Sequence, residues 1–281
     1  MIFSIIVVCL NAGEKLRETV ESICRQTEQD YEIVIKDGGS TDEATKECLR
    51  ELEKRGEEDR RIRVYRHEKD TGIYDGMNQA VRYSCGDYLF FLNCGDCFWD
   101  ERVLARVREQ IGKHGEKQGE EKERGPYIFY GNICERMTGT VVQSNPKIDD
   151  FACYRNLPCH QACFYGAALF EKRGFGTRYR VRADYEHFLW CYYRGGAKPV
   201  YMPVTVAFYE GGGFSETKEN RRRSRREHKE IVAAYMPVRK VWMYRMIMAL
   251  TFAPLRTWIA QNPLTAGIYQ KIKKRLYRAK I

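Results

Sequence analysis

The sequence lacks the features that would place a protein within a membrane. No run of roughly 18 apolar residues is present, which is the length that a spanning helix requires. The most apolar stretch, 241–260, is interrupted by Arg245, Pro254 and Arg256, so we expect it to lie at a membrane interface rather than to cross the bilayer. The chain opens directly on an apolar strand pattern, without the composition of a signal peptide.

A disulfide framework is equally unexpected. The 11 cysteines are an odd number in a chain of 281 residues. Together with the missing export signal, they favour a reducing environment over an oxidising one. We therefore expect a cytoplasmic protein.

Two common nucleotide-binding motifs are also absent. The turn after the first apolar run reads Cys-Leu-Asn-Ala-Gly at 9–13, which lacks the G-x-G-x-x-G pattern of dinucleotide-binding folds. No Walker P-loop occurs anywhere in the chain. A nucleotide, if one binds, must be held in another way.

The net charge of +10 is concentrated at one end of the chain. Residues 216–281 contain 17 Lys and Arg and 4 Asp and Glu, so they carry 17 − 4 = +13 and leave 10 − 13 = −3 for the rest. A basic segment of this kind can contact anionic lipid or nucleic acid, or it can be a solvated helix face.

What the sequence does contain is a regular alternation of strand and helix patterns. Short β-branched apolar runs predict buried strands, and apolar residues at helical spacing follow each of them. The predicted strands are 3–9, 31–35, 62–66 and 88–92, and the predicted helices are 16–24, one that starts at a capping box at 40–43, 74–83 and 103–111. This alternation predicts an α/β fold with a mostly parallel central sheet flanked by helices.

The second half of the chain is less regular. We expect a mobile charged loop at 112–126, short strands at 127–130, 140–143, 200–202 and 205–209, and a helix at 183–193. Glycines at 211–213 close this region. We therefore place one domain at 1–214 and a basic helical tail at 215–281.

Polar side chains collect where the predicted strands end. Asn11 and Asp37 follow the first two strands, Asp70 follows the third, and Asn93 and Asp96 follow the fourth. Parallel strands bring their carboxyl ends to one edge of the sheet, where ligands of such folds bind. Carboxylates there indicate a diphosphate bridged by Mg²⁺ or Mn²⁺, because these cations prefer oxygen ligands.

The motifs at these strand ends resemble those of family 2 glycosyltransferases with the GT-A fold. The matching segments, in the expected order over residues 3–213, are 4–11, 22–27, 32–42, 72–78, 91–96, 160–161 and 183–186. The Gly-Ile-Tyr-Asp at 72–75 and the Leu-Asn-Cys-Gly-Asp at 92–96 are similar to those of a subgroup that includes colanic acid and other exopolysaccharide glycosyltransferases.

The resemblance implies roles for particular residues. Asp37 matches the residue that contacts the nucleotide base, Asp96 the last acid of the motif that holds the divalent metal, and Asp184 the general base that activates the acceptor hydroxyl. The residues implied to bind the nucleotide sugar are Asn11, Asp37, Asp70, Asn78, Asn93 and His160.

The sequence departs from the family pattern in two places. The usual Asp-x-Asp-Asp reads Asn93-Cys94-Gly95-Asp96, and Ala183 stands where many relatives carry Glu. The first departure leaves open a catalytically eroded protein that only binds nucleotide sugars. Separately, Cys94 and Cys97 form a C-x-x-C, which leaves open a zinc or redox site instead of plain packing.

The resemblance implies an inverting glycosyltransferase of the cell envelope. Its donor would be a UDP-, GDP- or dTDP-sugar, its cofactor Mn²⁺ or Mg²⁺, and its acceptor a growing glycan or a lipid-linked glycan. Basic residues at 221–226, with Trp242 and Phe252 nearby, favour contact with the anionic inner face of the cell membrane. A nucleic-acid-binding protein that uses the basic tail is the rival hypothesis, and no nucleic-acid motif supports it.

Overall fold

The structure is a computed structural model of the whole chain, and it describes residues 1–66, 68–118, 126–155, 157–211 and 217–251. The chain divides into two compact units, residues 1–231 and 232–281. The predicted boundary at 214 and 215 lies earlier than this division. The difference arises because helix α8 (Lys218–Tyr235) carries Glu227, which accepts hydrogen bonds from backbone amides of residues 180–182 in the first unit.

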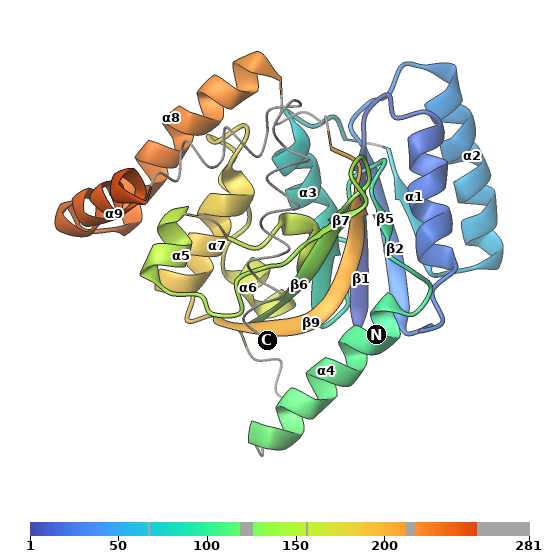
Figure 1. Cartoon of the computed structure of the whole chain (residues 1–281). Helices are drawn as coiled ribbons and strands as arrows, with labels where there is room; N and C mark the ends of the chain where they lie inside the picture. The colour runs from blue at the N-terminus through green and yellow to red at the C-terminus, as the bar shows by residue number, and fades with distance from the viewer. Residues whose placement is uncertain (67, 119–125, 156, 212–216, 252–281) are drawn as a thin grey trace. The chain divides into compact units, whose positions relative to one another are not determined.

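One mixed sheet forms the centre of the first unit (Figure 1). The strands are β1 (Phe3–Cys9), β2 (Tyr31–Asp37), β3 (Ile62–Tyr65), β4 (Tyr88–Phe91), β5 (Cys97–Phe98), β6 (Tyr127–Glu135), β7 (Thr140–Val142), β8 (Cys163–Gly166) and β9 (Lys198–Tyr209). Their order in the described residues is β3-β2-β1-β4-β8-β6-β9-β5, with β7 paired to β6.

The sheet is parallel in its first half and mixed in its second. Strand β1 pairs in parallel with β2 and β4, and β2 pairs in parallel with β3. Strand β8 then joins β4 in the antiparallel direction, and β6 is antiparallel to β8 but parallel to β9. The predicted parallel sheet is therefore confirmed for β1 to β4, where strand and helix alternate along the chain.

Helices cover the sheet on both sides, with α1 and α2 on one side of β1 and β2 and α3 on the other (Figure 1). The helices of the first unit are α1 (Glu14–Cys24), α2 (Glu43–Glu58), α3 (Ile73–Val81), α4 (Val103–Gln118), α5 (Asp150–Arg155), α6 (Ala167–Lys172), α7 (Ala183–Tyr193) and most of α8, with a short 3₁₀ turn at His160–Ala162. The second unit begins at the end of α8 and contains α9 (Val238–Leu250).

Burial explains why the sequence forms these elements. All seven residues of β2 are buried, as expected for a central strand covered on both faces. Leu16, Val20 and Ile23 recur at helical spacing on α1, and none of the three is exposed to solvent. Burying a large aliphatic side chain contributes about 1.5–3 kcal/mol, so these repeated apolar positions fix both the helix and its packing.

The loop predicted at 112–126 is wrong for residues 112–118, which form the last two turns of α4. His114 packs against two rings of β6, with ring centroids 5.0 Å from Tyr127 and 5.6 Å from Phe129. Lys113 pairs with Glu109 one turn earlier. The packing of His114 on β6 stabilises the helix more than the glycines and charges of this segment destabilise it. The rest of the predicted loop, 119–125, lies outside the described residues.

Two smaller predictions also differ from the structure. The helix cap at 40–43 is Asp42, whose Oδ2 accepts the amide of Thr45 at 2.8 Å, and not Ser40. Strands 200–202 and 205–209 form the single strand β9. Its pairing with β6 shifts register near Pro203, which is the kind of irregularity that allows a proline inside a strand.

Candidate active site

A cavity of about 1140 Å³ opens over the carboxyl ends of the parallel strands. Six of the predicted site residues line it: Asn11, Asp70, Asn93, Asp96, His160 and Asp184. Asp37 and Asn78 are not among its lining residues. The loops after β1, β3 and β4 therefore converge as the strand-end argument predicts, and α7 and the 3₁₀ turn supply the opposite wall.

Asn11 and Asp37 hold together the loops that follow β1 and β2. Asn11 has a left-handed backbone conformation with φ of 51°, and its Oδ1 accepts the amides of Thr41 at 2.8 Å and Asp42 at 3.3 Å. Asp37 accepts hydrogen bonds from Ser40 N at 3.1 Å and from Ser40 Oγ at 2.5 Å. Asp37 thus shapes the loop behind the cavity wall, and its contact with a nucleotide base stays a prediction.

Asp70 occupies a space that two glycines leave open. A Cβ at Gly38 would lie 2.4 Å from Asp70 Oδ2, and one at Gly76 would lie 2.8 Å from it. The Asp70 carboxylate also accepts the amide of Gly72 at 3.1 Å. Burial raises the pKa of Asp70 above its usual value, and the positive charge of Lys36 opposes this shift. Any side chain at position 38 or 76 would displace this carboxylate.

Asp96 lies at one end of the cavity and is almost fully buried, with 4% of its surface exposed. Its Oδ1 accepts the amide of Glu210 at 2.9 Å, and its Oδ2 accepts Gln161 Nε2 at 3.1 Å. Burial raises the pKa of Asp96 to about 6, although both hydrogen bonds act in the opposite direction. The ionised carboxylate therefore lacks sufficient compensation from the surrounding protein.

Gly95 explains why this chain departs from the usual acidic motif. Its φ is +96°, in the region that favours glycine, and a Cβ there would lie 2.3 Å from Glu210 Oε2. Glu210 forms an ion pair with Lys15 at 2.9 Å. A carboxylate from the end of β9 thus occupies the space beside Asp96 where an aspartate at position 95 would lie.

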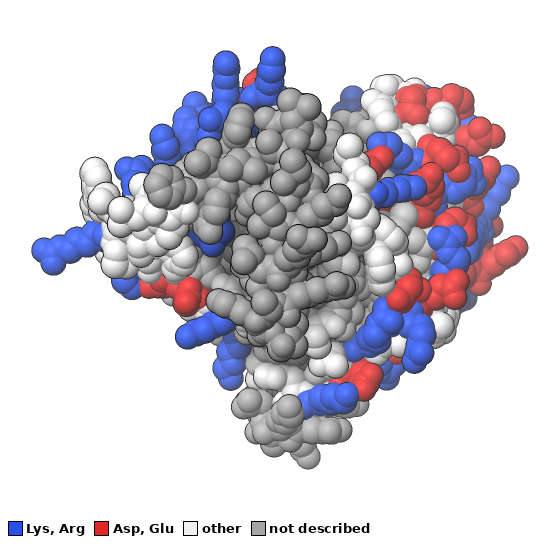
Figure 2. All heavy atoms as spheres, in the orientation of Figure 1, with Lys and Arg blue, Asp and Glu red and all other residues white. Residues whose placement is uncertain are grey.

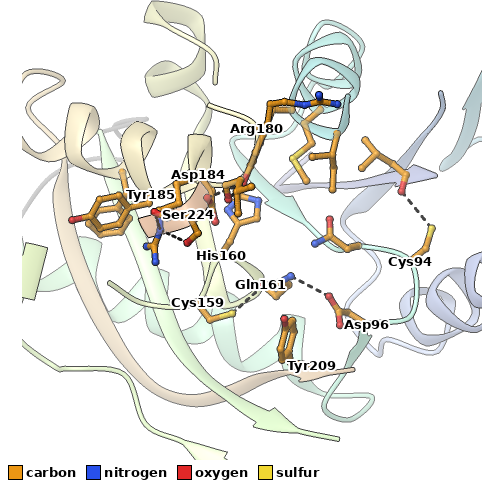
Figure 3. Close-up of a pocket in the computed structure, with 18 of the residues that line it drawn as sticks. Cys94, Asp96, Cys159, His160, Gln161, Arg180, Asp184, Tyr185, Tyr209 and Ser224 are labelled. Carbon is orange, nitrogen blue, oxygen red and sulfur yellow. Dashed lines mark hydrogen bonds between the residues drawn. The ribbon is translucent and has the colours of Figure 1, made fainter. Parts of the chain in front are cut away.

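The short turn at 160–162 reaches both carboxylates of the cavity. Gln161 binds Asp96, while the neighbouring His160 lies next to Asp184 (Figure 3). The His160 ring stacks on Phe91 at 5.1 Å, and neither of its buried ring nitrogens has a hydrogen-bond partner within the described residues. Burial lowers the pKa of His160, and the charge of Asp184 opposes this. His160 is therefore a neutral imidazole with unsatisfied polar atoms beside the cavity.

Asp184 lies in the first turn of α7 and lines the cavity next to His160 (Figure 3). The hydroxyl of Tyr74 lies 2.8 Å from Asp184 Oδ1 and 2.9 Å from the carbonyl oxygen of Val181, and it donates to one of them at a time. Burial, aided by Asp184, raises the pKa of Tyr74 well above its usual value. Tyr74 therefore stays protonated and orients the carboxylate.

Asn78 makes its contacts behind the cavity. Its Nδ2 donates to the carbonyl of Phe175 at 2.9 Å, and its Oδ1 accepts the amide of Phe175 at 2.8 Å. The Phe175 ring in turn lies 5.7 Å from His160 and 5.2 Å from Phe91. Asn78 therefore fastens the segment that packs behind His160, and its role in nucleotide binding stays a prediction.

Cys94 and Cys97, the two thiols of the C-x-x-C, are partly buried. Cys94 Sγ donates to the carbonyl of Val8 at 3.4 Å, and burial raises the pKa of Cys94 to about 12. In the part of the chain that the structure describes, no three His, Cys, Asp or Glu side chains form a cluster that could hold a metal. Plain packing accounts for Cys94 and Cys97 better than a zinc site does.

Sequence reasoning missed three side chains that complete the site: Tyr74, Glu210 and Glu227. Tyr74 lies inside a quoted motif, but nothing in the sequence indicates that its hydroxyl reaches Asp184, 110 residues later. Glu210 directly follows β9, so the strand-end argument could have found it if it had been applied to the last strand of the sheet.

Several solved structures share this fold. Staphylococcus aureus TarS has a TM-score of 0.58 at 18% identity, and the match covers 75% of this chain and 37% of that one. Residues 1–349 of TarS in complex with UDP-GlcNAc give 0.56 at 16%, covering 97% and 70% of the two chains. The mannosyltransferase PcManGT from Pyrobaculum calidifontis, in complex with GDP-Man and Mn²⁺, gives 0.53 at 14%, covering 91% and 82%. The fold is that of a GT-A glycosyltransferase.

The sequence comparisons identify the family. Residues 4–118 match the profile described as Glycosyl transferase family 2. The PGL/p-HBAD biosynthesis glycosyltransferase of Mycobacterium tuberculosis is 36% identical over 217 residues, which cover 76% of this chain and 79% of that protein. The chain belongs to glycosyltransferase family 2 and is a glycosyltransferase. The exopolysaccharide subgroup stays a prediction.

Proposed function

We propose that the protein is an inverting glycosyltransferase that transfers a sugar from a nucleoside diphosphate to a hydroxyl group of a glycan or a lipid-linked acceptor. The observation that carries this proposal is that Asp96 and Asp184 line one cavity and that neighbouring residues of one turn reach both, because Gln161 binds Asp96 and His160 lies next to Asp184 (Figure 3). An inverting displacement needs both a group that stabilises the leaving diphosphate and a base for the acceptor hydroxyl, which attacks the anomeric carbon on the side opposite to the bond that breaks.

Asp184 acts as the general base in this proposal. Its carboxylate, oriented by Tyr74, accepts the proton of the acceptor hydroxyl as the new glycosidic bond forms. A positioned base of this kind contributes roughly 10²–10⁴-fold to a rate. His160, neutral and buried beside Asp184, binds a hydroxyl of the transferred sugar, and Asn11 and Asp70 line the end of the cavity that takes the nucleotide.

The residues around Asp96 fit a divalent cation. Its buried carboxylate has an unfavourable ionised state that a cation would stabilise, and Asn93 Oδ1 is a buried acceptor without a partner among the described residues. Mg²⁺ and Mn²⁺ prefer such oxygen ligands and need only one or two protein carboxylates when a diphosphate is bound. Asp96 would hold the cation, which stabilises the charge of the departing nucleoside diphosphate.

The donor class is best decided by a binding panel. UDP-, GDP- and dTDP-sugars are titrated into the wild type and Asp96→Asn, with and without Mn²⁺, by calorimetry. We expect one nucleotide class to bind, with an affinity that Mn²⁺ increases at least 10-fold in the wild type only. Glu109→Gln, an exposed change on α4, serves as the matched control. Binding of no nucleotide sugar by the folded protein would refute the proposed donor class.

Turnover distinguishes an enzyme from an eroded binding protein. That alternative arose because Gly95 stands where the family pattern has an aspartate. The carboxylate of Glu210, however, occupies the space that a side chain at position 95 would fill. We therefore expect the donor that binds to be consumed when an acceptor is supplied. Tight donor binding without any turnover over a panel of lipid-linked glycans would favour the eroded alternative instead.

We also propose that the protein works at the anionic inner face of the cell membrane. Lys and Arg gather along α8, whereas both signs of charge are mixed over α1 and α2 (Figure 2). On α9, Val238, Trp242 and Met246 are four residues apart and are 71%, 60% and 54% exposed. None of the described helices is long and apolar enough to span a membrane. Residues 215, 216 and 252–281 of the predicted tail lie outside the described residues.

A further inference from the structure

Helix α8 is basic on its surface but directs one buried carboxylate inward. Arg221, Arg222, Arg225 and Arg226 are exposed, whereas Glu227 is only 4% exposed. Burying a lone carboxylate is costly unless hydrogen bonds satisfy it. The environment of Glu227 therefore indicates a specific partner for this residue.

The partners of Glu227 are three successive backbone amides. Its Oε1 accepts the amide of Arg180 at 3.0 Å, and its Oε2 accepts those of Val181 at 3.0 Å and Arg182 at 2.9 Å. Hydrogen bonds from amides to an ionised carboxylate are stronger than those between neutral groups. The segment that leads into α7 is thus held by a side chain from a helix more than 40 residues away.

This segment has no cap of its own. Arg182 is the N-cap residue of α7, and its side chain makes no capping hydrogen bond. Instead, Arg182 Nε donates to Ser224 Oγ at 2.7 Å, and Ser224 lies one turn before Glu227 on α8. The negative charge of Glu227 near the start of α7 is also favourable for the helix dipole. Helix α8 therefore holds the N-cap residue of α7 and the two residues before it, where α7 has no side-chain cap of its own.

The catalytic base lies directly after this segment. Asp184 is two residues beyond Arg182, and Tyr74 contacts both Val181 O and Asp184 Oδ1. Ser224 and Arg180 line the same cavity as Asp184 (Figure 3). A second contact fixes α8 in place, because His228 Nε2 lies 2.9 Å from the carbonyl of Tyr154 on α5. One turn of α8 thus forms part of the wall around the base.

We propose that Glu227 is a positioning residue for Asp184, and that the Ser224–Glu227 turn of α8 builds the acceptor end of the cavity. This inference rests on the proposed function for the role of Asp184. In this account the basic helix has two faces with different tasks. The outer face carries the arginines, and the inner face sets the geometry of the base.

The test compares Glu227→Gln with Glu230→Gln, an exposed change on the same helix whose partner Arg226 lies 3.6 Å away. Glutamine keeps the shape of Glu227 but presents an amide donor to at least one of the three backbone amides, which then loses its acceptor. Hydrogen exchange is followed on a peptide covering residues 176–186. We expect exchange of this peptide to be at least about 10-fold faster in Glu227→Gln alone, since each lost bond opens the segment locally.

Two further measurements separate positioning from general destabilisation. In Glu227→Gln, the donor dissociation constant should stay within about twofold of the wild type, while sugar release from the donor into water falls about 10-fold or more. Glu227→Asp should recover part of the rate. The positioning role would be overturned if hydrogen exchange at 176–186 or the rate of sugar release were unchanged in Glu227→Gln. It would also be overturned if exchange became faster across β1 to β4 and donor binding weakened equally, because the whole first unit would then be destabilised. A wild type that binds no donor would instead refute the proposed function.

Discussion

Asp96 is the residue whose ionisation is expected to respond most clearly to folding and to a cation. Its pKa is raised from 3.8 to about 6 by burial. An acid with a raised pKa favours the folded state at low pH, and this contribution is lost as the pH rises through the folded pKa. A shift of this size corresponds to about 3 kcal/mol.

We therefore predict that the cation-free wild type loses stability between about pH 4 and pH 7, relative to Asp96→Asn. At pH 7 and with a nucleoside diphosphate present, adding Mn²⁺ should stabilise the wild type and leave the variant unchanged. Unfolding in urea, measured across this pH range with and without Mn²⁺, checks both statements. Parallel pH curves for the two proteins would contradict the assignment of Asp96.

His160 gives a second prediction at the scale of a single residue. Its two ring nitrogens have no partner within the described residues, so replacement by Phe removes unsatisfied polar atoms while keeping a ring on Phe91. We expect His160→Phe to have an unfolding temperature no lower than the wild type. Its affinity for the nucleotide sugar should fall about 10-fold, the value of roughly one hydrogen bond to a buried group.

The prediction requires that His160→Phe weakens binding of the nucleotide sugar and not binding of the nucleotide alone. The affinity for the nucleoside diphosphate without its sugar should not change in His160→Phe, because His160 lies beside Asp184 rather than at Asp96. His114→Phe on α4, which is outside the cavity, is the matched control. Equal losses for the nucleotide and the nucleotide sugar would show that His160 does not contact the sugar.

Strand ends made much of the site predictable, residue by residue. Asn11, Asp70, Asn93 and Asp96 line the cavity because the carboxyl ends of parallel strands share one edge. The sequence could not show that Asp37 binds Ser40 or that Glu210 fills the space at Gly95. The strand-end argument could have named Glu210 as a site residue, but which side chain each of these carboxylates meets depends on loop conformation, which local patterns do not give.

At the scale of elements, β1 and β2 were predictable because each is a buried run of seven mostly apolar residues, and β3 and β4 were predictable because they continue the alternation of strand and helix patterns. The short elements were not predictable. Strand β8 contains four residues and α5 and α6 contain six each, so their local preference is weak and tertiary packing determines them. Helix α4 shows the same effect, because its final turns depend on the contact between His114 and β6.

Asn78 provides a prediction that concerns the link between α3 and the segment before α7. Asn78→Ala leaves the amide and the carbonyl of Phe175 without their partner. We expect the free energy of unfolding in urea to fall by about 2–4 kcal/mol, since each buried unsatisfied group costs about 1–3 kcal/mol. Unchanged stability together with weaker nucleotide binding would instead support the direct ligand contact that the sequence motif implied.

The whole molecule is expected to bind anionic membranes through α8. Replacing Arg221, Arg222 and Arg225 by Gln should lower partitioning onto vesicles that contain phosphatidylglycerol by about 100-fold, at about 1 kcal/mol for each basic residue. Replacing Lys46, Arg50 and Lys54 on α2 is the matched control. Cosedimentation at several salt concentrations measures the effect. Equal binding of the α8 variant and the wild type would contradict this role for α8.

The most direct test of the central claim is the configuration of the sugar that the enzyme releases. The nucleotide sugar that binds is incubated with the wild type and Asp184→Asn, and the first-formed free sugar is observed by proton NMR before it mutarotates. We predict that the wild type releases the anomer opposite to that of the donor, and that Asp184→Asn binds the donor normally but releases sugar at least about 100-fold more slowly. Release with retained configuration, or undiminished release by Asp184→Asn, would contradict the account.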